Sequence, residues 1–246
     1  MSRHSILLPL LMMSAAALCA CSGGNSPAPS SPPAKPATPA PSTNEAQAAK
    51  EAALYEQMRA SGSWDVALTL GNEVVTKFAG TPAAAQVQQT LAEVRAKGEA
   101  QANQQRLRRL WAYTATPEAG GTQYAAAITS KNPLSGNAKV RLVLRQHPKW
   151  GQSVYLLLDS AKFDCRKGCA TLPVSFDGAA AQQMKATIPP TGEPALFIDD
   201  DKGFIAKLEK SQTVAIGATV KDLGDKTMEF EVGGYDPSKL PQKPKK

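Results

Sequence analysis

The stretch Lys139-Val-Arg-Leu-Val-Leu-Arg145 decides the fold of the second half of this 246-residue chain. Successive side chains of a strand point to opposite faces, so Val140, Leu142 and Leu144 share one face. Arg141 and Arg145 fall on the other face. A strand that is apolar on one side and charged on the other is typical of an antiparallel sheet covering a core.

Similar short segments lie on both sides of this stretch, separated by turn signals such as Asn132-Pro and Asp177-Gly. Eight short strands predict an antiparallel β-sandwich or barrel, and we favour the sandwich. One short helix, residues 203–210, interrupts them, and its Phe204, Ile205 and Leu208 are placed to cover an open end of the sandwich. The expected strands are residues 123–129, 139–145, 153–159, 172–176, 184–188, 195–198, 213–218 and 228–232.

The preceding part of the chain has a helical pattern. Residues 45–60 are rich in Ala and Glu, with Leu54 and Met58 four apart, and Ser63 is expected to cap the next helix. A third helix is expected to begin at Thr81-Pro82, since Thr suits the N-cap and Pro the first turn. We therefore expect a helical hairpin or three-helix arm before the sandwich, and an α+β fold. The apolar stripe of the second and third helices consists of Trp64, Ala67, Leu68, Gly71, Val74, Val75, Phe78, Val87, Leu91, Val94, Leu107, Leu110 and Trp111.

Residues 77–86, KFAGTPAAAQ, resemble the helix-to-helix corner of tetratricopeptide-like repeats. One corner predicts a single repeat-like hairpin instead of an array. The expected division of the chain is a signal peptide at 1–20, a lipidated tether rich in Pro, Ala and Ser at 21–44, the helical arm at 45–113, the sandwich at 114–237 and a basic disordered tail at 238–246.

The N-terminus has the pattern of an export signal, with Arg3 before an apolar run that is too short to span a membrane. Leu18-Cys19-Ala20-Cys21 resembles the lipobox of bacterial lipoproteins, which implies cleavage before Cys21 and acyl chains on this cysteine. The alternative is an ordinary signal peptide with an Ala-x-Ala-like site. By resemblance to enteric-type lipoproteins, Ser22 in place of Asp favours the outer membrane, facing the periplasm.

The net charge of +7 at pH 7 is mildly basic, and no nucleic-acid partner is expected. Cys165 and Cys169 are the cysteines left in the folded part. An oxidising compartment favours a disulfide between them. A reactive dithiol is the alternative, although Cys-x-x-x-Cys is not the Cys-x-x-Cys redox spacing.

The order of elements from about residue 110 to 236 resembles the invasion-associated locus B family. The resemblance rests on a strand before a cysteine-containing turn and on the motifs Val174-x-Phe-Asp, Phe197-Ile-Asp, Phe204-x-x-x-Leu and Phe230-x-Val-Gly-Gly. The same order is similar to small envelope proteins associated with type VI secretion. Both resemblances imply an exported β-sandwich module without a described catalytic mechanism.

The sequence offers few groups for catalysis or metal binding, so we expect no catalytic residue, cofactor or metal. His147 is the one histidine left after signal cleavage, which excludes multi-histidine metal sites. Ser153 lacks the Gly-x-Ser-x-Gly elbow of serine hydrolases. The Asp199-Asp-Asp201 run is open to carboxylate chemistry or calcium binding, but we favour a solvated turn that caps the helix at Gly203.

The expected loop Arg145-Gln-His-Pro-Lys-Trp150 mixes cations with an aromatic ring, so Arg145, His147, Lys149 and Trp150 are the candidate binding residues. Arg and Trp carry much of the binding energy at protein interfaces, and Trp also stacks on sugars. The competing interpretation is that Trp150 packs back on the edge of the sandwich.

These patterns predict a non-enzymatic lipoprotein, held on the outer membrane by acyl chains, that acts as a binding or adaptor module for an envelope protein or for peptidoglycan. Two alternatives stay open. One is an inhibitor or immunity-type lipoprotein against a wall-degrading enzyme, with residues 147–150 as the plug. The other is a carboxylate-dependent glycan hydrolase, which requires a cleft with two acids about 5 to 9 Å apart.

Overall fold

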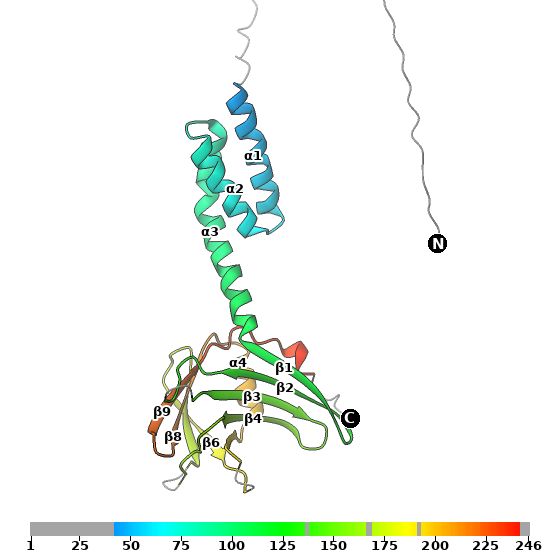
Figure 1. Ribbon diagram of the computed structural model, residues 1–246, viewed down its shortest axis with the longest axis vertical. Helices are drawn as coiled ribbons and strands as arrows, with labels where there is room; N and C mark the ends of the chain where they lie inside the picture. The colour runs from blue at the N-terminus through cyan, green and yellow to red at the C-terminus, as the bar shows by residue number, and fades with distance from the viewer. Residues whose placement is uncertain (1–41, 136–137, 166–168, 191–192, 242–246) are drawn as a thin grey trace, which may run out of the picture. The chain divides into compact units, whose positions relative to one another are not determined.

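The computed structural model describes residues 42–135, 138–165, 169–190 and 193–241 (Figure 1). The expected signal peptide, the lipidation site at Cys21, nearly all of the tether and residues 242–246 of the tail lie outside these residues. The described chain begins with three helices, α1 (Thr43–Ala60), α2 (Trp64–Lys77) and α3 (Pro82–Arg109). Nine strands and the short helix α4 follow, so the α+β class is confirmed.

Local capping explains where the helices begin. Ser42 and Glu45 form a reciprocal capping box at α1, and Thr81 accepts a hydrogen bond from the Ala84 amide at the start of α3. Ser63 occupies the N-cap position of α2 as expected, but its side chain makes no capping hydrogen bond. Its hydroxyl instead accepts a hydrogen bond from that of Ser61.

The three helices share a small core, whose buried members are Ala48, Ala52, Tyr55, Ala67, Val74, Phe78, Ala84, Val87, Leu91 and Val94. The expected stripe on α2 and α3 is therefore confirmed at most positions. On α1 the inward face differs from expectation, since Tyr55 is buried and Leu54 is 43% exposed. Gly71 makes this packing possible, because a Cβ there would lie 2.7 Å from Leu91 Cδ1 and 2.8 Å from Tyr55 Cε2.

The strands are β1 (Trp111–Glu118), β2 (Gly121–Thr129), β3 (Val140–His147), β4 (Gly151–Leu158), β5 (Thr171–Phe176), β6 (Gln182–Thr187), β7 (Ala195–Ile198), β8 (Val214–Val220) and β9 (Gly224–Phe230). They form one antiparallel sheet in the order β1-β2-β3-β4-β7-β6-β5-β8-β9. The beginning of β6 pairs with β5 and its end with β7, so β6 connects the two halves of the sheet.

Side chains from both halves of the sheet meet in one core, which makes the arrangement sandwich-like. Val140, Leu142 and Leu144 are fully buried in it, as the deciding stretch predicts. On β9, buried Met228 and Phe230 alternate with more exposed neighbours in the same way. The other large buried members include Ile128, Leu156, Leu158, Leu172, Val174, Leu196, Ile198, Val214, Ile216 and Val232.

β1 was not expected as a strand, and Trp111 was assigned to the helical stripe. The structure corrects both points, because Trp111 begins β1 and its side chain lies in the sheet core. β1 is an edge strand that pairs only with β2, and most of it is exposed. An edge strand tolerates Pro117, and its polar outer residues give no alternating apolar signal.

The short helix α4 (Asp201–Leu208) is confirmed, but it begins and ends two residues earlier than the expected 203–210. Asp200 accepts a hydrogen bond from the Gly203 amide at 2.9 Å, and Phe204, Ile205 and Leu208 are buried in the sheet core. The ordered chain also continues further than expected. A 3-10 turn, η1 (Pro237–Lys239), follows the last strand, and Leu240 is only 1% exposed. This part of the expected tail is therefore ordered.

The end of α3 contacts the segment after β9, and we call this contact the joint, consisting of Arg106, Trp111, Glu231, Gly234 and Tyr235. The Arg106 guanidinium donates to both carboxylate oxygens of Glu231, at 3.1 and 2.8 Å. Trp111 Nε1 donates to the Val232 carbonyl at 3.3 Å, and its ring lies 5.1 Å from that of Tyr235. Gly234 is required, since a Cβ there would lie 2.2 Å from the Leu107 carbonyl carbon.

Candidate functional site

The candidate binding residues lie where β3 turns into β4. Sequence reasoning placed residues 145–150 in a loop, but β3 continues to His147, which pairs with Gly151. The loop is therefore only Pro148, Lys149 and Trp150. Gly151 closes it with a φ of +79°, a conformation that favours glycine. Arg145 and His147 are strand residues, so the sheet fixes their backbone.

His147 stabilises this turn through hydrogen bonds and ring stacking. Its side chain is 6% exposed, and its Nδ1 accepts hydrogen bonds from the backbone amides of Lys149 at 3.0 Å and Trp150 at 3.2 Å. The Trp150 ring stacks on the imidazole, with ring centroids 3.9 Å apart and an angle of 18° between the planes. Trp150 nevertheless remains 66% exposed. It therefore rests on the sheet by one face and presents the other face to solvent.

Arg145 lies at the centre of three aromatic rings on the same outer face of the sheet. Its Cζ is 5.6 Å from the Trp150 centroid, 5.3 Å from that of Tyr155 and 5.9 Å from that of Phe197. Its Nε donates to Ser153 Oγ at 3.1 Å. Tyr155 and Phe197 also contact each other, with centroids 4.8 Å apart. These contacts hold the guanidinium group in place.

We call this set the Arg145 strip; it consists of Arg145, His147, Trp150, Tyr155 and Phe197. Burial raises the pKa of the Tyr155 hydroxyl, and the nearby Arg145 partly opposes that shift. The sequence pattern does not single out Tyr155 and Phe197 as binding residues, because both lie in apolar segments that predict core strands. The alternation of side chains along a strand does predict that Tyr155 lies on the outer face, because its neighbours Val154 and Leu156 are buried.

The cations of the strip form no salt bridge within the described part of the chain, although Glu193 lies near enough to Tyr155 to contribute to the rise of its pKa. No carboxylate there forms a salt bridge with Arg145 or with the exposed Lys149. On the same strand, Arg141 is paired with Asp159 at 2.7 Å. Arg141 therefore has an acidic partner on the sheet, whereas Arg145 forms no salt bridge with a described residue.

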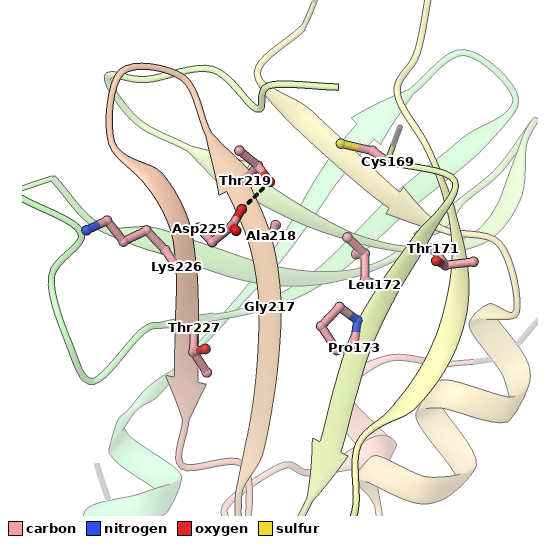
Figure 2. Close-up of a pocket in the computed structure, with 10 residues that line it drawn as sticks. All are labelled: Cys169, Thr171, Leu172, Pro173, Gly217, Ala218, Thr219, Asp225, Lys226 and Thr227. Atoms are coloured by element: carbon pink, nitrogen blue, oxygen red, sulfur yellow. Dashed lines mark hydrogen bonds between the residues drawn. The ribbon is translucent and has the colours of Figure 1, made fainter. Parts of the chain in front are cut away.

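A second feature is a cavity of about 360 Å³ beside β8, shown in Figure 2. β5 pairs with β8 only as far as Val174 and Ile216, because Pro173 has no N–H with which to continue the ladder. Further along β8, the Thr219 carbonyl accepts a hydrogen bond from the Asp164 amide at 2.9 Å. The cavity is lined by the β8 residues between these two contacts, from Gly217 to Thr219, and by Leu172 and Pro173 of β5.

The expected disulfide between Cys165 and Cys169 is confirmed, with the two Cα atoms 4.9 Å apart. Cys169 and the residues around Gly217 line the cavity (Figure 2). Its polar lining includes Thr171, Thr227 and the hydrogen-bonded pair of Thr219 and Asp225. The reactive-dithiol alternative is not supported, because the two sulfur atoms are bonded to each other.

The Asp199-Asp-Asp201 run has structural partners. Asp200 caps α4, as expected, and Asp199 accepts a hydrogen bond from the Thr187 hydroxyl at 2.8 Å. Within the residues that the structure describes, no group of three or more His, Cys, Asp and Glu side chains is arranged to hold a metal ion. The cavity beside β8 has Asp225 as its one acidic lining residue among those described.

Comparison with known proteins gives one distant structural neighbour to report. The chain is similar to the crystal structure of invasion associated protein B from Bartonella henselae, with 15% sequence identity and a TM-score of 0.36. The match covers 51% of this chain and 84% of that one. No known protein family and no curated protein matches the sequence. Among the described residues, no helix is long and apolar enough to cross a membrane.

Proposed function

We propose that this chain is a lipid-anchored envelope protein that binds another envelope protein through the Arg145 strip, without catalysing a reaction. The observation that carries the binding proposal is the exposure of Trp150. Its ring is 66% exposed although it is held rigidly on His147. A fixed and exposed aromatic ring loses little side-chain entropy on binding, and Trp, Tyr and Arg are the residue types that dominate interface energies.

The anchoring part of the proposal rests on the sequence, because Cys21 lies outside the described residues. The expected location is the outer membrane, facing the periplasm. Labelling with radioactive palmitate should mark the wild-type protein, and Cys21→Ser should remove both the label and the membrane association. A Cys19→Ser variant is the matched control and should keep both. Loss of neither in the Cys21→Ser variant would contradict the lipid anchor.

The binding part is tested by crosslinking the tagged protein in its native envelope. The wild-type protein should capture a specific envelope protein, and a Lys149→Ala, Trp150→Ala double variant should lose it. Val66→Ala is a suitable control, because Val66 is 44% exposed on α2, away from the strip. If the double variant still captures the same protein, the strip is not the binding surface. Recovery of peptidoglycan fragments alone would favour glycan binding or cleavage instead.

The two alternatives receive no specific support from the site. An inhibitor that plugs an active site needs a protruding loop, whereas the β3–β4 loop has three residues and its Trp ring lies on the sheet. A retaining or inverting glycan hydrolase needs two carboxylates in one cleft, and the cavity beside β8 has Asp225 as its one acidic lining residue among those described. We therefore keep protein binding as the proposal.

A further inference from the structure

The side chain of Arg145 is preorganised, which is the first step toward the chemistry of its partner. Ser153 accepts from Nε at 3.1 Å, and the rings of Trp150 and Tyr155 flank the guanidinium. No described residue accepts a hydrogen bond from the two terminal nitrogens, Nη1 and Nη2. These nitrogens form the planar fork that binds a carboxylate through two parallel hydrogen bonds.

The cations Arg145 and Lys149 determine which charge a partner must carry. Arg145 has no acidic partner among the described residues, whereas Arg141, four residues earlier on the same strand, is paired with Asp159. Lys149 adds another cation beside Trp150, and its ammonium group has no partner in the described chain either. The complementary partner is therefore anionic at the centre of the strip.

The shape of the surface at the Arg145 strip determines which class of partner fits it. Trp150 is 66% exposed, so the strip presents an open aromatic face to solvent. Small molecules and glycan chains bind best in concave sites that bury most of their surface. An open aromatic surface with a central arginine instead matches a protein–protein contact, with an apolar centre and Arg as anchor.

We infer that Arg145 recognises the carboxylate of an Asp or Glu side chain on the surface of a partner protein, with apolar groups around that acid packing on Trp150, Tyr155 and Phe197. This inference rests on the proposed function and adds the chemistry of the contact. Ser153 is a positioning residue, since it orients the guanidinium group and leaves Nη1 and Nη2 for the carboxylate.

A zero-length carbodiimide crosslink tests the inference, because this reagent joins a carboxylate to an amine only when the two are in contact. The probe is the detergent-solubilised envelope fraction of the producing cells, incubated with the full-length tagged protein. Mass spectrometry should identify an amide bond between Lys149 Nζ and one Asp or Glu side chain of a partner protein. Arg145→Gln should lower the yield by at least about ten-fold, the usual scale for loss of one partner of a charged pair.

Arg145→Lys gives a sharper result, since it places an amine at the expected contact. It should form a crosslink at residue 145 to the same acidic side chain. Arg141→Gln is the matched control and should leave the yield of the Lys149 crosslink unchanged. Circular dichroism of each variant checks that the sheet is intact, so that unfolding is not mistaken for lost recognition.

A photocrosslinking amino acid in place of Trp150 separates failure of the inference from failure of the proposed function, because it needs no carboxylate. If it captures a protein while Arg145→Lys forms no carbodiimide crosslink, protein binding stands and carboxylate recognition is wrong. If the Lys149 yield is the same in Arg145→Gln as in wild type, the inference is also wrong. If neither reagent captures a protein and only glycan is recovered, the proposed function itself fails.

Discussion

The joint and the Arg145 strip are built from the same residue types, each with an arginine, a tryptophan and a tyrosine. In the joint, Trp111 is 5% exposed and hydrogen-bonded to the Val232 carbonyl, and Arg106 is paired with Glu231. In the strip, Trp150 is 66% exposed and Arg145 has no acidic partner among the described residues. Both polar groups of the joint, the Trp111 indole N–H and the Arg106 guanidinium, therefore have partners within the chain.

This difference shows how the same side chains serve cohesion in one place and are available for recognition in another. A buried indole N–H is costly to leave without a partner, so a chain that uses it for folding supplies an acceptor. The exposed Arg106 is paired with Glu231 as well. A group that the chain leaves unsatisfied at an exposed, rigid position is free to bind an external partner.

Replacing the two tryptophans should separate the regions most clearly. Trp111→Ala should lower the free energy of unfolding by about 3–5 kcal/mol, because it removes a large side chain from the sheet core. Trp150→Ala should lower it by about 1 kcal/mol or less, since only one face of its ring has contacts. Denaturant unfolding followed by circular dichroism measures both. Equal losses for the two variants would mean that Trp150 is a structural residue.

The close packing of the joint should make Gly234 sensitive to a single added methyl group. Gly234→Ala should lower the free energy of unfolding by about 3 kcal/mol, because the new Cβ would lie 2.2 Å from the Leu107 backbone. Gly98→Ala on α3 is the control. Its Cβ would have ordinary contacts at 3.7 Å, and alanine should stabilise the helix by about 0.5–1 kcal/mol. A tolerated Gly234→Ala would show that the joint is loosely packed.

The two arginines should differ in how their replacement depends on pH. The hydrogen bond from Arg106 holds the pKa of Glu231 below its usual value. The unfolded pKa of a glutamate is about 4.3, so the stability that the pair contributes is present above that pH and is lost as the pH falls through the lower folded value. Arg106→Gln should therefore destabilise the protein at pH 7 by less than Gly234→Ala does, and the difference from wild type should shrink below about pH 4.

Arg145→Gln is the control for this titration, because no described carboxylate is paired with Arg145. Its effect on stability should be smaller than that of Arg106→Gln and should not change between pH 7 and pH 3. Thermal unfolding of the three proteins across this range gives the comparison. If Arg145→Gln showed the same pH dependence, an acid within the chain would satisfy the strip, and the inferred role of an external carboxylate would be lost.

The smallest expected change is spectroscopic. Trp150 should account for most of the tryptophan emission that iodide quenches, because it is exposed and lies beside the cations Arg145 and Lys149, which attract the anion. Trp150→Phe should remove that quenchable fraction with little change in stability. Trp64 is half-buried and Trp111 buried, so a variant that kept the full quenching would place Trp150 inside the protein.

Much of the fold could be predicted from local patterns. The helices were expected near their observed bounds because caps such as Thr81-Pro82 and a stripe at helical spacing are properties of neighbouring residues. Eight of the nine strands were expected because one face of each is buried. β1 was missed because its pairing with β2, and not an apolar face, makes it a strand. Leu54 was preferred to Tyr55 for the same kind of reason, since only the packing against Gly71 and Leu91 shows which side is inward.

The sequence by itself determined the α+β class, the alternation of β3, the disulfide partners and the residue types at the β3–β4 turn. It required the tertiary structure to show that Tyr155 and Phe197 lie beside Arg145 and that β6 connects the two halves of the sheet. The same holds for the finding that Arg106 forms a salt bridge with an acid, whereas Arg145 forms none with the described residues. Local patterns record backbone period and burial, whereas the pairing of charges and rings depends on strand order and register, which bring residues as distant as Arg106 and Glu231, 125 positions apart, into contact.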